Sequence, residues 1–377
     1  MKLSTKDLGI LSDDLTGACD VAGYFVPAVG PVRICVMPAA FDVSDGGLSV
    51  VNLQSRRMSQ EQSCITSERV ARRLADRRVV FQKIDTAFRG PVGAGLEGLA
   101  RALGPRRIVV APAIPRIGRV TRGGVQYLAG VPIHQTEFAR DPSWPIYSAG
   151  VRENLRRSGS IDCEICDAET QDDLIRVIDE ALRTPQVLLV GSLGLAEALA
   201  SRMERCVPVG TVPPRADRVL IVSGSQYQRS HVQLAAAARE RTVRMVDVHP
   251  MRPLVWPSDP IGALIVRLTP EQIPPDTAGV TPLARLTAAV ASRIRQRPPE
   301  GLAIIGGETA FDLLGRIGVT QLWIHGVFAD VVSYGTLQGG ILDGRPCMLK
   351  GGSVGPDDAV IRMLDVFSSR GPRSETA

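Results

Sequence analysis

The chain has 377 residues, of which 44% are hydrophobic, 22% charged and 4% aromatic, and its formal net charge is +5. A usual domain has roughly 100–200 residues, so this length predicts two domains with sizeable cores. The mild positive charge includes no dense Lys/Arg run among aromatics, and nucleic acid is therefore not expected as a partner.

The first half of the chain alternates short aliphatic runs with helical patterns. The predicted strands are 8–11, 32–37, 48–53, 79–85, 107–113 and 186–192, and the predicted helices are 67–77, 92–103 and 172–183. Such alternation predicts a parallel α/β sheet buried on both faces. Ligands of these sheets bind at the carboxyl ends of the strands.

A shift in composition divides the chain. The stretch VPVGTVPPRAD (207–217) contains three prolines and no periodic pattern, so it is predicted to be a linker. A second α/β segment follows, with strands predicted to begin at 218, 262 and 301, and the tail 368–377 is predicted to be disordered. We expect an α/β fold with two domains, 1–210 and 211–377, each with a mainly parallel sheet flanked by helices.

The cysteines and the first residues predict a cytoplasmic protein. The seven cysteines are scattered and odd in number, which is not typical of a disulfide framework. The opening residues MKLSTKDLGI turn polar at once, unlike a signal peptide. Because no run of about 18 apolar residues occurs, no membrane partner is expected. The sequence leaves open whether the protein is a homo-oligomer.

Two adjacent carboxylates, Asp13 and Asp14, follow the first predicted strand. Like charges side by side repel, so something must offset that cost. A helix N-cap explains one of them, whereas a site for a metal, a proton or a polyhydroxy ligand explains both. Thr16 and Gly17, just beyond, suit the close approach of a ligand to the backbone.

A second charged group lies in QKIDTAFRG (82–90), where a later strand ends. Lys83 and Asp85 are two residues apart and share one face of the strand, and Arg89 follows in the turn. The three are expected to converge on one ligand, and a surface ion pair worth about 0–1 kcal/mol is the alternative. Arg56, after strand 48–53, is a further candidate cation.

The segment 111–142 is predicted to be a long ordered loop or lid. Loops of this length in compact domains are often functional. Gly123 and Gly124 lie in it, together with His134, for which a structural hydrogen bond and a base remain equally open. Further on, CEIC (163–166) has zinc-like spacing but lacks a second ligand pair and reads as a strand, so no zinc is expected.

Three glycine-rich turns follow strands in the second half: VSGSQYQ (222–228), IIGGETAF (304–311) and LKGGSVG (349–355). A glycine-rich turn that opens a helix offers backbone N–H groups to phosphate, and three in one domain predict a nucleotide site. None matches the Walker pattern or a full dinucleotide fingerprint. The candidate residues are Ser225, Gly306, Gly307, Glu308, Thr309, Lys350, Gly352 and Gly355.

Together these motifs resemble the four-carbon acid sugar kinases, or tetronate kinases, formerly a family of unknown function. The resemblance runs in order through SDDLTGA, KIDTAFRG, APAIPRIGRVTRGGVQYLAG, TEFARDP, VSGS, IIGGET and LKGGSVG. It implies an ATP-dependent transferase of carbohydrate metabolism, in which domain 1–210 binds the acid sugar, domain 211–377 binds ATP, and the active site lies in the cleft between them. The γ-phosphoryl group would pass to the terminal hydroxyl of threonate, erythronate or a 3-oxo-tetronate.

The resemblance also implies roles for the candidate residues. The ATP contacts would come from the three glycine-rich turns, and Mg²⁺, whose protein ligands the sequence leaves unknown, would neutralise the phosphates. One aspartate near the attacking hydroxyl would accept its proton, and Asp13 and Asp85 are the two candidates. The residues expected to bind the acid sugar are Asp14, Arg56, Lys83, Arg89, Gly123 and Gly124.

Two other functions remain open on the sequence. One is an NAD-dependent hydroxy-acid dehydrogenase, although the incomplete dinucleotide fingerprint counts against it. The other is a non-catalytic sensor that binds an acid sugar or a nucleotide.

Overall fold

The structure of the chain falls into two compact units. The computed structural model describes residues 2–41, 47–141, 144–204, 215–249, 254–257, 262–269, 280–329 and 331–368. The N-terminal unit is Met1–Pro208 and the C-terminal unit is Val209–Ala377. The predicted linker and the predicted disordered tail lie largely outside the described residues, and the domain limits 1–210 and 211–377 stay a prediction.

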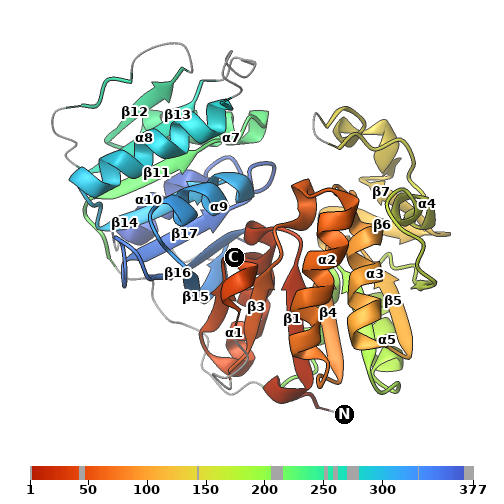
Figure 1. Ribbon diagram of the computed structural model, residues 1–377. Coiled ribbons are helices and arrows are strands. Elements are labelled where there is room, and N and C mark those ends of the chain that lie inside the picture. Colours follow the sequence, from red (N-terminus) through yellow and green to blue (C-terminus); the bar gives the residue numbers. More distant parts are fainter. Residues whose placement is uncertain are drawn as a thin grey trace, which may run out of the picture. The chain divides into compact units, whose positions relative to one another are not determined.

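Parallel strands form the main sheet of the N-terminal unit (Figure 1). They are β1 (Leu8–Ser12), β2 (Val32–Cys35), β3 (Ser49–Asn52), β4 (Val79–Lys83), β5 (Arg107–Ala111), β9 (Glu164–Ile165) and β10 (Val187–Gly191). Their order is β2-β3-β1-β4-β10-β5-β9. Every residue of β1, β4 and β10 is buried, which confirms the predicted aliphatic parallel sheet.

Helices pack on both faces of this sheet. They are α1 (Leu15–Val29), α2 (Gln60–Ala71), α3 (Val92–Leu103), α4 (Val151–Arg156), α5 (Gln171–Ala181) and α6 (Leu193–Ala200). α2 packs against α3, while α1 and α5 pack against α6. α2 begins before the predicted 67–77, because Ser59 and Gln62 form a capping box ahead of it.

The direction of the connections reverses between β1 and β4. The chain leaves β1 through α1 toward β2 on one side, and it leaves β4 through α3 toward β5 on the other. Right-handed crossovers in opposite directions place α1 and α3 on opposite faces of the sheet. Such a reversal opens a crevice beyond the carboxyl ends of the two strands, and the predicted charged residues follow these ends.

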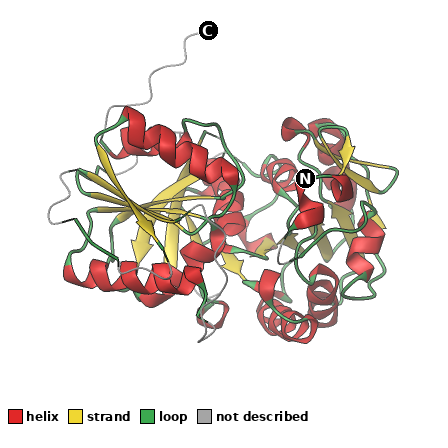
Figure 2. Ribbon diagram, turned by 90° about the horizontal axis from the view of Figure 1, so that it is seen from above, coloured by secondary structure: helices red, strands yellow, loops and turns green. Residues whose placement is uncertain are grey.

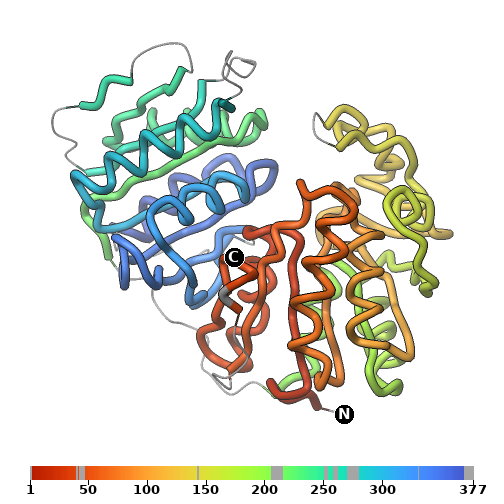
Figure 3. Tube along the Cα trace, in the orientation of Figure 1, coloured from red at the N-terminus to blue at the C-terminus, as the bar shows by residue number. Residues whose placement is uncertain are grey.

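The segment predicted to be a loop or lid is instead a small antiparallel sheet with short 3₁₀ helices; Figure 1 labels β6 and β7, and Figure 3 traces the backbone of the segment. Its strands are β6 (Arg119–Arg122), β7 (Val125–Leu128) and β8 (Val131–Pro132). Gly123 and Gly124 join β6 to β7 with φ of +57° and +72°. A two-residue turn with positive φ at both positions is the favoured hairpin connection, so the Gly-Gly pair was a hairpin signal.

The remaining short elements of the N-terminal unit are 3₁₀ helices. They are η1 (Thr5–Asp7), η2 (Pro38–Ala40), η3 (Ser55–Arg57), η4 (Arg72–Leu74), η5 (Pro115–Ile117), η6 (Ile133–Gln135) and η7 (Glu137–Arg140).

The C-terminal unit has a mainly parallel sheet with the order β12-β13-β11-β14-β17-β16-β15. Within it, β16 runs antiparallel to both of its neighbours, β17 and β15. Its strands are β11 (Val219–Ser223), β12 (Val243–Val248), β13 (Ala263–Leu268), β14 (Gly301–Ile305), β15 (Gln321–Phe328), β16 (Val332–Gln338) and β17 (Pro346–Lys350). Its helices are α7 (Gln228–Glu240), α8 (Pro282–Gln296), α9 (Gly307–Arg316) and α10 (Ala359–Phe367). α7 packs with α10 and α8 with α9, and Figure 2 shows helices on both sides of the strands.

Each unit has its own aliphatic core. In the N-terminal unit the core includes Leu11, Val80 and Val190, and in the C-terminal unit it includes Ile221 and Ile265. Across the described ranges, the longest apolar helices fall short of what a bilayer crossing needs.

Candidate functional site

Asp14 is the N-cap of α1. Its Oδ1 accepts the Gly17 N–H at 3.1 Å, and its Oδ2 accepts the Thr16 hydroxyl at 2.7 Å. β1 ends at Ser12, so both carboxylates lie in the strand-to-helix turn that follows the carboxyl end of the strand. Capping therefore explains Asp14, as the sequence allowed for one of the pair, and it leaves Asp13 unexplained.

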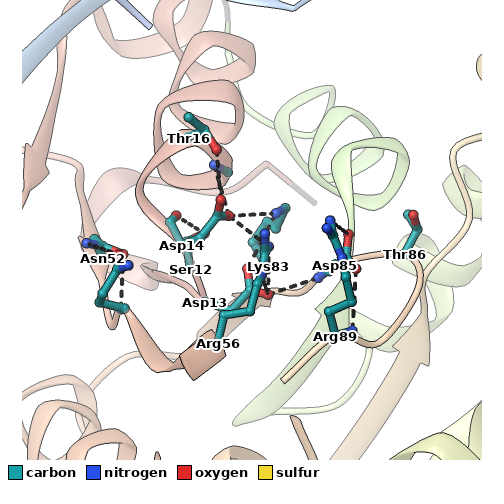
Figure 4. A network of polar contacts seen from close by, with 12 residues as sticks. Ser12, Asp13, Asp14, Thr16, Asn52, Arg56, Lys83, Asp85, Thr86 and Arg89 are labelled. Carbon is teal, nitrogen blue, oxygen red and sulfur yellow. Dashed lines mark hydrogen bonds and ion pairs between the residues drawn. The ribbon is translucent and has the colours of Figure 1, made fainter. Parts of the chain in front are cut away.

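Two cations oppose the pair of carboxylates (Figure 4). Asp13 Oδ2 accepts hydrogen bonds from Arg56 Nε at 3.2 Å and from Arg56 Nη2 at 3.0 Å, and Nη2 also lies 3.0 Å from Asp14 Oδ1. Lys83 Nζ lies 3.5 Å from Asp13 Oδ1 and 3.4 Å from Asp14 Oδ1. The side chains of all four are at least four-fifths buried. Arg56 and Lys83 thus offset the repulsion between the two carboxylates.

Asp85 and Arg89 form a second pair beside the first. Arg89 Nε donates to Asp85 Oδ2 at 2.7 Å and Arg89 Nη2 donates to Asp85 Oδ1 at 3.1 Å, which is the two-pronged geometry of a strong pair. The Asp85 N–H donates to Asp13 Oδ2 at 3.1 Å and joins the two groups. Phe88, just before Arg89, has a φ of +57°, a strained conformation for a bulky residue.

Neighbouring opposite charges keep Asp14, Asp85 and Lys83 ionised. Burial alone would raise the pKa of Asp14, but Arg56 and then Lys83 hold it below its ordinary value. Burial would also raise the pKa of Asp85, which Arg89 holds below its ordinary value. Burial alone would lower the pKa of Lys83, but Asp13 and then Asp14 raise it. Asp14, Asp85 and Lys83 are therefore charged at neutral pH.

Sequence reasoning missed three residues at this site. The Phe138 ring lies beside two guanidinium groups, with its centroid 5.5 Å from Arg89 Cζ and 5.3 Å from Arg119 Cζ. Arg119 donates to the hydroxyl of Thr86, and Arg89 Nη1 lies 3.5 Å from Asp141 Oδ2. Arg119, Phe138 and Asp141 all lie in motifs that carry the resemblance, but no local pattern distinguished them from their neighbours.

A small cavity adjoins the cluster. It is lined by Asp13, Ser55, Arg56, Ser63, Ser67, Gln82, Ile84, Arg89, Gly90, Pro91, Val92, Gly95 and Leu96. Its volume of about 10 Å³ accommodates about one water molecule. Ser67 Oγ and Gln82 Oε1 are buried and have no hydrogen-bond partner in the part of the chain that the structure describes, so a polar molecule in the cavity would satisfy them.

Gly123 and Gly124 occupy a different place from the charged cluster. On the β6–β7 turn, their N–H groups donate to the two carboxylate oxygens of Asp167, at 2.5 and 2.9 Å. A ligand that used these amides would have to displace that carboxylate. Their predicted contact with the acid sugar stays a prediction.

In the C-terminal unit the three glycine-rich turns meet. The Gly224 N–H donates to Thr309 Oγ1 at 3.2 Å and joins the first turn to the second. The Gly306 N–H donates to the carbonyl of Lys350 at 2.8 Å and joins the second to the third. Ser230 Oγ lies 2.9 Å from Ser225 Oγ and 2.6 Å from the carbonyl of Gly352, which joins the first to the third.

The place where these turns meet is also a reversal of connections. The chain leaves β11 through α7 toward β12, and it leaves β14 through α9 toward β15 on the other side. Ligand crevices of open α/β sheets lie beyond the carboxyl ends of two such strands. The candidate residues Ser225 and Gly306 to Thr309 follow these ends, and α9 begins at Gly307, so its N-terminal amides face a position suited to phosphate.

Comparison with known families assigns a class to each unit. Residues 8–163 match a family described as a sugar-binding N-terminal domain, and residues 269–360 match one described as a nucleotide-binding C-terminal domain. Together the matches cover more than half of the chain. One chain therefore combines a sugar-binding match with a nucleotide-binding match, the combination that a sugar kinase requires.

Individual relatives narrow this class. A D-threonate kinase from Salmonella typhimurium is 24% identical and spans 94% of this chain and 97% of its own. A D-erythronate kinase from Heliobacterium modesticaldum is 25% identical (96% and 97%), and a 3-oxo-tetronate kinase from Brucella melitensis is 23% identical (93% and 87%). The chain belongs to the four-carbon acid sugar kinase family, whose members are phosphotransferases with an alcohol acceptor.

A solved structure supports the fold. It comes from Salmonella typhimurium LT2, is described as a putative tRNA synthase, and superimposes with a TM-score of 0.73 over 94% of this chain and 98% of its own. Its sequence identity is 19%, so this likeness shows the α/β fold alone.

Proposed function

We propose that this protein transfers the γ-phosphoryl group of ATP to the terminal hydroxyl of a four-carbon acid sugar such as threonate, erythronate or a 3-oxo-tetronate. The observation that supports this most directly is the arrangement of Arg56 beside Asp13 at the crevice between β1 and β4. A tetronate carries one carboxylate and several hydroxyls, so it needs a cationic fork and charged acceptors side by side. The cluster contains both.

Arg56 is suited to hold the carboxylate of the acid sugar. Its Nε and Nη2 are used on Asp13 and Asp14, and among the described residues no acceptor is assigned to Nη1. The two aspartates fix the plane of the guanidinium, so its remaining N–H groups are oriented before a ligand arrives. Arg56 and Asp13 line the same cavity.

Asp13 is the better placed of the two candidate catalytic aspartates. Arg89 fixes both oxygens of Asp85, and Asp85 is not among the residues that line the cavity. Asp13 lines the cavity and lies between Arg56 and Lys83. In our proposal Asp13 orients the attacking hydroxyl and receives its proton as the oxygen bonds to phosphorus and ADP departs. Asp85 fixes Arg89, and Lys83 and Asp14 complete the acid-sugar site.

The C-terminal unit is proposed to bind ATP through the amides of its glycine-rich turns. Ser225, Gly306, Gly307, Glu308, Thr309, Gly352 and Gly355 are the proposed contacts. Among the described residues, no three His, Cys, Asp or Glu side chains form a metal-binding group. This fits Mg²⁺ held mainly by phosphates and water with one or two carboxylates, and Mg²⁺ would neutralise phosphate charge.

An ADP-release assay over threonates, erythronates and 3-oxo-tetronates tests the proposal. Wild type should turn over at least one of them with Mg·ATP, and Asp13→Asn should lower kcat at least about 100-fold while the protein stays folded. Asp179→Asn is the matched control, because Asp179 pairs with Arg202 on the surface of the same unit. Inactivity of folded wild type on the whole panel, or wild-type kcat in Asp13→Asn, contradicts the proposal.

A further inference from the structure

The ammonium of Lys350 points into its own loop. Lys350 ends β17, it is fully buried, and its Nζ donates to the carbonyls of Gly351 at 2.6 Å and of Val354 at 2.8 Å. The sequence suggested that this lysine contacts the nucleotide. Because the ammonium donates hydrogen bonds to two carbonyls of the loop, its first effect is to fix the conformation of the loop.

Two residues of α7 hold the same loop. Gln233 Nε2 lies within hydrogen-bond distance of three successive carbonyl oxygens, those of Val354 (3.2 Å), Gly355 (3.1 Å) and Pro356 (2.7 Å), which share its two N–H groups. Ser230 Oγ donates to the carbonyl of Gly352 at 2.6 Å. Ser230 and Gln233 are also fully buried, so three side chains without solvent exposure hold five carbonyls of residues 351–356.

The positions of the carbonyls fix the directions of the N–H groups. In a planar trans peptide the C=O and the next residue's N–H point in opposite directions. Because the carbonyls of Gly351, Gly352 and Val354 point toward the buried side chains, the N–H groups of Gly352, Ser353 and Gly355 point away from them. Where such neighbouring amides turn toward one point, they form a concavity for anions. Gly355 has a φ of +95°, which this path requires.

We propose that Lys350, Gln233 and Ser230 are positioning residues that hold the loop 351–355 with its amides toward the phosphates of the nucleotide. The inference rests on the proposed nucleotide site of the C-terminal unit. In this arrangement the phosphates contact the backbone amides of the loop. Lys350 adds positive charge from the opposite side of the loop, whereas the uncharged Gln233 only fixes the conformation of the loop. A lysine that contacted phosphate directly would need no such support from α7.

Gln233→Leu separates loop shape from charge. Binding of AMP-PNP with Mg²⁺ is measured by calorimetry, together with the KM for the acid sugar and the melting temperature. Loss of hydrogen bonds to three carbonyls should raise the nucleotide Kd about tenfold or more and leave the acid-sugar KM unchanged. Lys350→Met should raise the nucleotide Kd further, and the double variant should be less than additive, because both side chains bind the Val354 carbonyl.

Thr287→Val is the matched control. Thr287 is equally buried in the same unit, and its hydroxyl lies within hydrogen-bond distance of the Asp312 carboxylate in α9 and of the Leu283 carbonyl, at 2.9 Å, in α8. It should lower the melting temperature without weakening nucleotide binding. If folded Gln233→Leu binds the nucleotide as wild type does, the inference is overturned while the proposed function stands. If wild type itself binds no nucleotide, the proposed function fails instead.

Ser230→Ala covers the case in which Gln233→Leu does not fold. This substitution removes only the hydroxyl oxygen of Ser230. Amide hydrogen exchange then measures how firmly the loop is held when no ligand is bound. The amides of Gly352, Ser353 and Gly355 should exchange faster in this variant, and the nucleotide Kd should rise. Unchanged exchange together with unchanged Kd overturns the inference.

Discussion

Gly17→Ala should damage the charged site while it favours the helix. Gly17 is the third residue of α1, and a Cβ built there would lie 2.5 Å from Asp14 Oδ1 and closer still to Lys83 Nζ. Ordinary contact for a Cβ begins at 3.4 Å. The Asp14 carboxylate oxygen therefore has to retreat by about 0.9 Å, the difference between 3.4 and 2.5 Å, and the Lys83 ammonium, which is closer, by more than that.

The energetic effects of this substitution have opposite signs. Lys83 Nζ now lies 3.4–3.5 Å from the two carboxylates, and a retreat of that size weakens each attraction by about 1 kcal/mol at an effective dielectric constant of about 20. Alanine in place of glycine favours a helix by up to about 1 kcal/mol. The net loss of about 1 kcal/mol should lower the melting temperature by about 2–4 °C.

The kinetic effect should be much larger than the thermal one. A displacement of about 1 Å in a positioning group can cost on the order of 100-fold in rate. We therefore expect kcat/KM for the acid sugar to fall by about that factor, with the nucleotide KM unchanged. Steady-state kinetics with each substrate varied, together with a thermal scan, measure both.

Gly194→Ala is the control for Gly17→Ala. It places the same methyl group in α6 of the same unit, 2.5 Å from the backbone carbonyl oxygen of Ala113. It should lower the melting temperature and leave both KM values unchanged. Wild-type kcat/KM in Gly17→Ala, or an equal kinetic loss in Gly194→Ala, would refute the reasoning.

Two further predictions concern the same charges. Arg56→Lys keeps the positive charge but loses the guanidinium that joins Asp13 to Asp14. The KM for the acid sugar should therefore rise at least about tenfold, with a smaller change in kcat. An unchanged KM would contradict the proposal that Arg56 binds the carboxylate of the acid sugar. The pKa values of Asp14 and Asp85 are lower in the folded state than in the unfolded chain, so the stability they contribute is present above about pH 4 and is lost as pH falls below it. The part of the melting temperature that these two groups contribute should stay level from about pH 6 to 4 and fall from about pH 4 to 2. The fall should be steeper for wild type than for Asp85→Asn, and identical profiles contradict this.

The fold was predictable because its strands are buried on both faces. Runs such as 79–85 and 186–192 are aliphatic throughout, which distinguishes them from surface segments. The small sheet of β6, β7 and β8 was missed although the Gly-Gly pair between 119–122 and 125–128 signalled a hairpin. Its strands are only partly buried, so the hydrophobic alternation that marks a strand is weak there.

The charged site was predictable to the extent that its residues follow strand ends. Asp13, Asp14, Lys83 and Asp85 come together because β1 and β4 are neighbours, and parallel strands bring their carboxyl ends to one edge. Arg119 reaches the site from the small sheet, and nothing in its neighbourhood of the sequence encodes that long-range contact. Side-chain direction is equally hidden from the sequence.

Lys83 and Lys350 illustrate how side-chain direction decides a role. Each is the last residue of a buried strand in a glycine- or aspartate-rich motif, and the sequence assigned both to ligand binding. Lys83 faces two carboxylates, which fix the ammonium as one charge of a balanced cluster. Lys350 faces carbonyls, so its hydrogen bonds shape a loop. The acceptor opposite each ammonium determines whether a lysine at a strand end joins a cluster of charges or fixes a segment of backbone, and only the folded chain brings that acceptor into place.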